Sequence, residues 1–83
     1  MNNEAALISS VCKNKDISVL MAEDVDEIFT SHRDIWEGLK SYYYKFRSVP
    51  DATILIEKFP DFDPVDTKGE TGYYLEQVKN EYL

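Results

Sequence analysis

The clearest periodic pattern lies in the middle of the chain, from about His32 to Phe46. Its apolar positions recur at i, i+4, i+7 and i+11, and most side chains on the opposite side are polar. Such a period is typical of an amphipathic helix with one buried face. We expect Thr30 or Ser31 to cap this helix, and we expect the helix to be the central core element. Its predicted buried stripe is Ile35, Leu39, Tyr42 and Phe46.

Two shorter helical patterns precede it. The first runs from Asn3 to Cys12, with Asn3 placed to cap it and Glu4 in its first turn. After a polar break at residues 13–15, Asp16 is placed to cap a short second helix, and an acidic turn follows at residues 24–29. The inward positions of the two helices are Leu7, Ile8, Val11, Cys12, Ile17, Leu20 and Met21.

Prolines divide the second half of the chain. Pro50 disfavours helix at the residue before it, and Asp51 is placed to cap a segment that ends near residue 59. The β-branched residues of this segment leave a short strand open, although its other residues favour a helix. A proline-containing loop then runs to about residue 69, and a last helix begins at Glu70 or Thr71. The inward face of that helix is Tyr74, Leu75, Val78 and Tyr82.

These patterns predict an all-α fold, in the form of a compact bundle of five or six short helices. The chain has 83 residues, which corresponds to a single domain spanning residues 1–83. Hydrophobic residues make up 43% of it, and this is too much apolar material for a disordered segment.

Charge and the N-terminal sequence narrow the possible partners. The 9 basic and 16 acidic residues give a formal net charge of -7. This charge repels a phosphate backbone, so we expect no direct binding to nucleic acid. The N-terminus is polar and acidic, unlike a signal peptide, and the longest apolar run is too short to cross a bilayer. We therefore expect no membrane association and a cytoplasmic location.

Residues that commonly carry chemistry are few and scattered. The glycines at positions 38, 69 and 72 do not form a phosphate-binding loop, and the single Cys12 excludes an internal disulfide and a paired-cysteine zinc site. Cys12 and His32 can form a nucleophilic pair only if they meet in space. We expect Cys12 to be a small core residue and His32 to be a capping or surface residue. We expect no catalytic residue, metal or cofactor in this chain.

Two acidic clusters are candidate cation sites. They are Asp24, Asp26 and Glu27 in the first half, and Asp61, Asp63 and Asp66 in the second. An EF-hand loop requires a defined ligand spacing with a central glycine and a final glutamate, and neither cluster has it. We interpret both clusters as solvated faces or helix caps.

The outer face of the 32–46 helix supplies candidate residues for a protein interface, namely Glu37, Lys40, Tyr44 and Arg47. Tyrosine and arginine are the residue types that most often anchor interfaces, although a lone exposed tyrosine is often without a role. Phe62 is a further candidate, because it lies in a proline-bounded loop with no periodic reason to be buried. The alternative is that Phe62 folds back over the edge of the core.

Four short segments occur in an order that resembles a known family. The first is EAALISS at residues 4–10, which has an acidic start followed by small and apolar residues. IFTSHRDIW at 28–36 has a phenylalanine, a His-Arg pair and an apolar helix, VPDATIL at 49–55 has a proline turn, and YYL at 73–75 starts a helix. In order and spacing they resemble the N-terminal domain of DnaB-type hexameric replicative DNA helicases, particularly the branch carried by large bacteriophages. The resemblance covers nearly the whole chain.

The resemblance implies a non-catalytic scaffolding domain in a bacterial or phage-infected cell. In that family the N-terminal domain forms a collar on the ring and contacts primase, helicase loaders and neighbouring subunits, while a separate domain carries the ATP-dependent motor. We expect the helical hairpin that completes the family's N-terminal domain to follow Leu83, so oligomerisation of these residues alone stays open.

Three alternatives remain. The first is a stand-alone phage or bacterial adaptor that binds a replication protein. The second is a small DNA-binding helical regulator, against which the acidic charge argues. An enzyme is the least favoured, because no catalytic constellation is present.

Overall fold

The computed structural model describes residues 3–22 and 25–82 of the chain. These residues form five α-helices and one short 3₁₀ helix, with no strand in the described ranges. The helices are α1 (Asn3–Asn14), α2 (Ser18–Met21), the 3₁₀ helix η1 (Asp26–Ile28), α3 (Arg33–Phe46), α4 (Ala52–Lys58) and α5 (Thr71–Tyr82). The predicted all-α bundle is confirmed, and the segment after Asp51 is a helix and not a strand.

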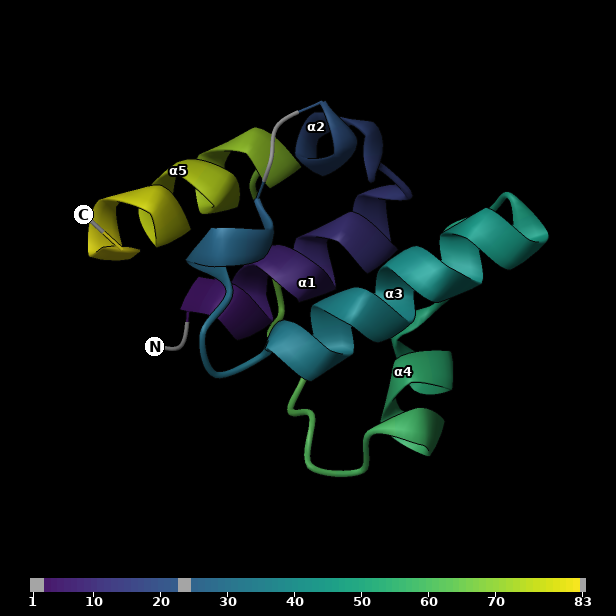
Figure 1. The fold of residues 1–83 in the computed structure, drawn as a ribbon. Coiled ribbons are helices and arrows are strands. Elements are labelled where there is room, and N and C mark those ends of the chain that lie inside the picture. Colours follow the sequence, from purple (N-terminus) through teal and green to yellow (C-terminus); the bar gives the residue numbers. More distant parts are fainter. Residues whose placement is uncertain (1–2, 23–24, 83) are drawn as a thin grey trace.

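The centre of the fold is α1, and the prediction that the 32–46 helix holds this place is wrong. Figure 1 shows α1 in the middle of the molecule, with α5 on one side and α3 on the other. Every residue from Glu4 to Cys12 is buried. The physical reason lies in its small side chains, because alanine and serine let neighbouring helices approach closely on several sides. These small residues are Ala5, Ala6, Ser9 and Ser10.

The fully buried residues of α3 all lie in its first half, although Tyr43 in the second half packs against the core. Its buried residues are Ile35, Trp36 and Leu39, and the Trp36 ring stacks on Phe29 with ring centroids 5.2 Å apart. The inward face of the helix is thus shifted toward Trp36 relative to the predicted stripe. The predicted burial of Phe46 is wrong, since its side chain is 56% exposed. Figure 1 shows the reason: the C-terminal end of α3 projects beyond its neighbours.

The start of α3 is held by a residue far away in the sequence. The helix begins after His32, and no side chain of its own N-cap bonds to it, contrary to the prediction for Thr30 or Ser31. The carboxylate of Glu4 instead accepts hydrogen bonds from the backbone N–H groups of Thr30 (2.9 Å) and His32 (3.1 Å). It also accepts bonds from the hydroxyls of Thr30 (2.8 Å) and Ser31 (3.3 Å).

These bonds control the ionisation of Glu4. Burial alone raises the pKa of its carboxyl, but the hydrogen bonds from Thr30, His32 and Ser31 outweigh burial and lower the pKa from its usual value of 4.5. Glu4 therefore stays ionised and joins the first turn of α1 to the loop before α3.

The predicted caps of α2 and α4 are also replaced by other contacts. Asp16 does not cap α2, and its carboxylate accepts a hydrogen bond from the Ser18 hydroxyl at 2.8 Å. Asp51 occupies the N-cap position of α4 without a side-chain cap bond and forms an ion pair with Lys15. Asp51 thus ties α4 to the end of α1.

The loop from residue 59 to residue 70 returns along α1 and delivers α5 to it. At its start the Phe59 ring lies against Gly38, where an added Cβ would come within 2.7 Å of the ring. Further along, the Val65 N–H donates to the Ser9 hydroxyl at 2.9 Å, and Lys13 donates to the carbonyl of Thr67. Leu75 and Val78 of α5 are buried as predicted, whereas the side chain of Tyr82 lies outside the described residues.

Candidate functional site

Large exposed aromatic side chains lie at the C-terminal end of α3. We call residues 42–47 the α3 tip. Tyr44 is 54% exposed and Phe46 is 56% exposed, and Ile54 of the adjoining α4 is 36% exposed. Large exposed aromatic side chains are typical of protein interfaces, because they bury much apolar area on contact.

The aromatic rings of the α3 tip support one another. The rings of Tyr42 and Phe46 are 4.6 Å apart at 44°, and those of Tyr43 and Tyr44 are 6.1 Å apart at 60°. The Lys45 ammonium lies 5.4 Å from the centre of the Phe46 ring. Because rings held in this way lose little conformational freedom on binding, the tip is a preorganised surface.

Arg47 ends the helix in the left-handed conformation, with φ 57°. Its backbone N–H donates to the carbonyl of Tyr43 at 2.7 Å, which satisfies one of the last carbonyls of the helix. The chain then turns sharply away through Ser48 and the buried Pro50. Tyr44 and Phe46 stay exposed beside this turn, whereas Tyr42 and Tyr43 are half-buried.

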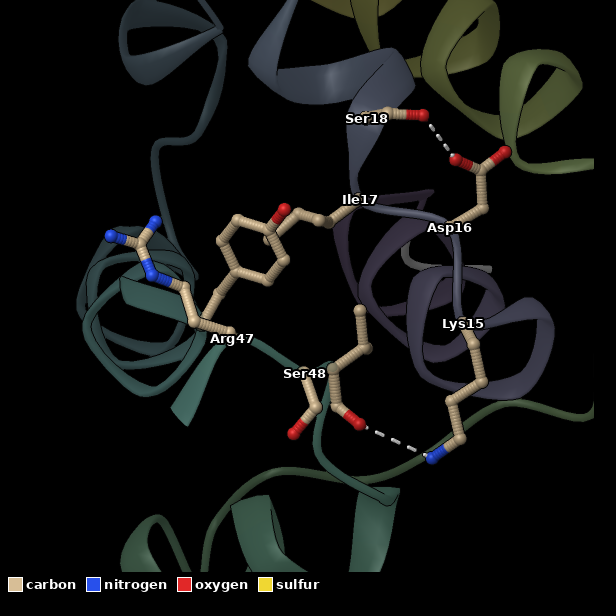
Figure 2. A pocket seen from close by; sticks show the side chains of 8 residues that line it. Lys15, Asp16, Ile17, Ser18, Arg47 and Ser48 are labelled. Carbon is tan, nitrogen blue, oxygen red and sulfur yellow. Dashed lines mark hydrogen bonds between the residues drawn. The ribbon is translucent and has the colours of Figure 1, made fainter. Parts of the chain in front are cut away.

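One cleft lies between the α3 tip and the connection from α1 to α2. It has a volume of about 420 Å³ and is lined by Lys15, Asp16, Ile17, Ser18, Tyr43, Arg47, Ser48 and Val49. Figure 2 shows the Arg47 guanidinium and the Lys15 ammonium pointing away from each other. The ammonium donates to the Val49 carbonyl at 3.3 Å and pairs with Asp51. The two cations therefore do not converge on one anion position.

A second cleft, which we call the α3–α4 cleft, lies on the other side of the α3 tip. It has a volume of about 170 Å³. Its lining is Gly38, Ser41, Tyr42, Lys45, Phe46, Ile54, Leu55 and Lys58. Apolar side chains line most of this cleft, and Lys45 and Lys58 give it a positive charge. None of the described residues that line it is Asp or Glu.

Four of the predicted interface residues lie along α3. Tyr44, Glu37 and Arg47 are exposed, and Glu37 lies 4.0 Å from Arg33 in an ion pair of consecutive helical turns. Lys40 is half-buried, with its ammonium 5.4 Å from the centre of the Trp36 ring. The structure thus brings Tyr44 and Arg47 together at the tip, while Glu37 and Lys40 lie nearer the middle of the helix.

The prediction that Phe62 offers an exposed surface is wrong. Its side chain is 4% exposed and its ring meets the edge of His32 at 6.4 Å and 78°. Its backbone N–H donates to the Phe59 carbonyl at 2.9 Å, and this turn directs the ring inward. Phe62 therefore covers the edge of the core, which was the alternative reading.

The sequence pattern missed two residues of this surface, Phe46 and Ile54. Phe46 matches the apolar period of the helix, and this period alone predicts that it is buried. The sequence contains one sign that Phe46 is exposed. Phe46 lies in the last turn of the helix, four residues before Pro50, where the chain must leave the helix axis.

The described part of the chain holds no group of three or more His, Cys, Asp or Glu side chains that could bind a metal ion. Asp24 and the side chain of Asp26 lie outside the described residues. Asp61, Asp63 and Asp66 are exposed, and Asp66 lies 3.6 Å from Lys13. The second acidic cluster is therefore solvated.

Cys12 and His32 are not joined by a hydrogen bond within the described residues. Cys12 is 4% exposed in the core, and the ring of His32 contacts the Ser31 hydroxyl (2.9 Å) and Phe62. Burial raises the pKa of the Cys12 thiol to about 11, with Lys15 lowering it and Asp51 raising it by smaller amounts. A thiol of this kind is a poor nucleophile at neutral pH.

We expect a thiol reagent such as iodoacetamide to modify Cys12 at least about a hundredfold more slowly in the folded protein than in urea, at pH 8. Both the small thiolate fraction and the burial of sulfur contribute. The rate is measured by mass spectrometry over time, and a free cysteine peptide serves as the control. Labelling of the folded protein at the peptide's rate would show that α1 is not enclosed.

Comparisons of the chain with protein-family models, with curated proteins and with solved structures found no match. None of the described helices has the length and apolar character that a membrane-spanning helix needs.

Proposed function

We propose that this chain is a non-catalytic protein-interaction domain, and specifically the N-terminal scaffolding domain of a DnaB-type replicative DNA helicase. Its partners are then primase, a helicase loader or neighbouring helicase subunits. The sequence resemblance supports the helicase assignment. The observation that carries the interaction role is the exposed aromatic α3 tip, where Tyr44 and Phe46 each expose more than half of their surface.

Three properties of the tip support protein binding. It offers aromatic and arginine side chains, which are the types that contribute most to interface energies. Its rings are already packed against one another, which lowers the entropy that binding costs. A cleft lies on each side of it, so that a partner has recesses in which to seat its own side chains.

The second candidate is a stand-alone phage or bacterial adaptor that binds a replication protein. It uses the same surface, so the α3 tip supports both candidates equally. The coding sequence downstream of Leu83 separates them. A phosphate-binding loop in the same reading frame supports the helicase domain, and a stop codon directly after Leu83 supports the adaptor.

We expect Tyr44→Ala to weaken binding to the cognate primase, loader or full-length helicase by about tenfold or more, with the melting temperature unchanged. The matched control is Tyr73→Ala on α5, because Tyr73 is 58% exposed and Tyr44 is 54% exposed. The measurement is a quantitative pull-down with each purified partner, together with thermal melts of the three proteins.

The two readouts separate an interface role from a structural role. Lost binding with an unchanged melt places Tyr44 in the interface, and lost stability places it in the core. If Tyr44→Ala and Tyr73→Ala both bind like the wild type, the α3 tip is a solvated surface and the interaction proposal for it fails.

A further inference from the structure

We propose that the α3–α4 cleft receives an apolar side chain from an acidic segment of the partner protein, whose carboxylates pair with Lys45 and Lys58. This inference rests on the proposed role in protein binding and identifies the chemistry of the segment that is bound. It concerns the side of the α3 tip that faces α4, where Phe46 and Ile54 are exposed.

The floor and walls of the cleft fit an apolar side chain. Leu55 is 2% exposed, and the more exposed Phe46 and Ile54 also line the cleft. The volume of about 170 Å³ is smaller than the roughly 300–1,000 Å³ of typical small-molecule sites. A cleft of this size is suited to one or two anchoring side chains of a protein segment and not to a bound cofactor.

Charge decides which kind of segment fits. The chain as a whole has a net charge of -7, yet two lysines and no described acidic residue line this cleft. Neither Lys45 nor Lys58 forms an ion pair with a described residue, whereas Lys13, Lys15 and Arg33 do. Because complementary charge steers association and fixes register, an acidic segment is the matching partner.

The arrangement of the rings favours a protein segment over a nucleic acid. Single-stranded nucleic acids stack their bases on open aromatic faces. The Phe46 ring instead packs at a tilt of 44° against Tyr42 and has the Lys45 ammonium near its face. The net charge of -7 also repels a phosphate backbone.

The first test is a titration of the isotope-labelled protein with two synthetic amphipathic peptides, followed by NMR. Both peptides carry leucine at i, i+3, i+4 and i+7; the remaining positions are mainly glutamate in one and mainly lysine in the other. We expect the acidic peptide to shift the amide signals of residues 38–46 and 54–58 and to bind about tenfold tighter than the basic one. Raising the salt from about 0.05 to 0.5 M should weaken it.

The second test uses two matched charge reversals. Lys58→Glu should weaken binding of the acidic peptide, and of the pulled-down partner, by about tenfold. Lys68→Glu, at an exposed position outside the lining of the cleft, should leave both unchanged within about twofold. Ile54→Asp should abolish binding of the acidic peptide, and melting curves confirm that each variant is folded. Equal effects of Lys58→Glu and Lys68→Glu would overturn the proposal.

Other occupants give distinct results in the same titration. If a thymidine oligonucleotide shifts these residues more strongly than the acidic peptide does, the cleft binds nucleic acid and the proposal fails. If the same signals shift with protein concentration alone, the occupant is a second copy of this chain, and the proposal also fails.

The two proposals can fail separately. If primase, loader or helicase is captured but Lys58→Glu has no effect, the cleft assignment falls and the helicase-domain proposal stands. If none of these partners is captured while the acidic peptide occupies the cleft, the helicase-domain proposal falls and the cleft assignment stands.

Discussion

Replacing Leu39 with alanine lowers the free energy of unfolding by about 2–5 kcal/mol, which is the usual cost of truncating a fully buried leucine. Leu39 is 0% exposed and belongs to the same core cluster as Trp36. A domain of 83 residues has a total stability of only about 4–12 kcal/mol, so the variant is close to unfolding at 37 °C. The measurement is urea unfolding followed by tryptophan fluorescence or circular dichroism.

Phe46→Ala is the matched control on the same helix. Phe46 is 56% exposed, and its truncation should therefore cost less than about 1 kcal/mol. The pair of variants tests which part of α3 is buried, because Leu39 and Phe46 lie on the same predicted stripe. Equal losses in the two variants would mean that the end of α3 is covered after all.

Glu4→Gln destabilises the fold by about 1–3 kcal/mol at pH 7, because the backbone donors of Thr30 and His32 lose a charged acceptor. Glutamine keeps the size of the side chain and one oxygen, so the loss reports the charge and the geometry of the bonds. Glu76→Gln on the exposed side of α5 is the control and should change stability by less than about 0.5 kcal/mol.

The effect of Glu4→Gln depends on pH in a defined direction. The pKa of Glu4 is lowered below 4.5 in the folded protein, so its stabilising contribution is fully present above the unfolded-state pKa. It is lost as the pH falls through the folded-state pKa. The difference in unfolding free energy between wild type and Glu4→Gln should therefore be constant from pH 7 to about pH 5 and shrink below pH 4.5. A difference that persists unchanged at pH 3 would assign the effect to packing.

Local sequence patterns predicted the helices well. The apolar period of residues 32–46 predicts α3, and Thr71 is one of two predicted starts for α5. The prolines bound the segment of α4, for which a helix is favoured and a short strand stays open. These signals succeed because helix spacing and proline breaks act over a few residues. The exposure of Tyr44 and Arg47 followed from the same period.

The errors concern contacts between distant residues. An apolar period predicts the inward face of α3 but not the point along the helix at which the core ends, and for this reason the predicted burial of Phe46 is wrong. The capping of the loop before α3 depends on Glu4, which is 26 residues away from Thr30. Phe62 lies in a loop without any period, so its burial depends on the helices that it meets.

The pairing of α1 with α5 has a consequence for synthesis on the ribosome. One side of α1 is covered by α5, and Asn3 donates a hydrogen bond to Glu81 across this contact. A nascent chain that has not yet exposed residues 71–82 therefore leaves one side of α1 uncovered, although most of the domain has been translated. We therefore expect the packing of α1 to be completed only after α5 has left the exit tunnel.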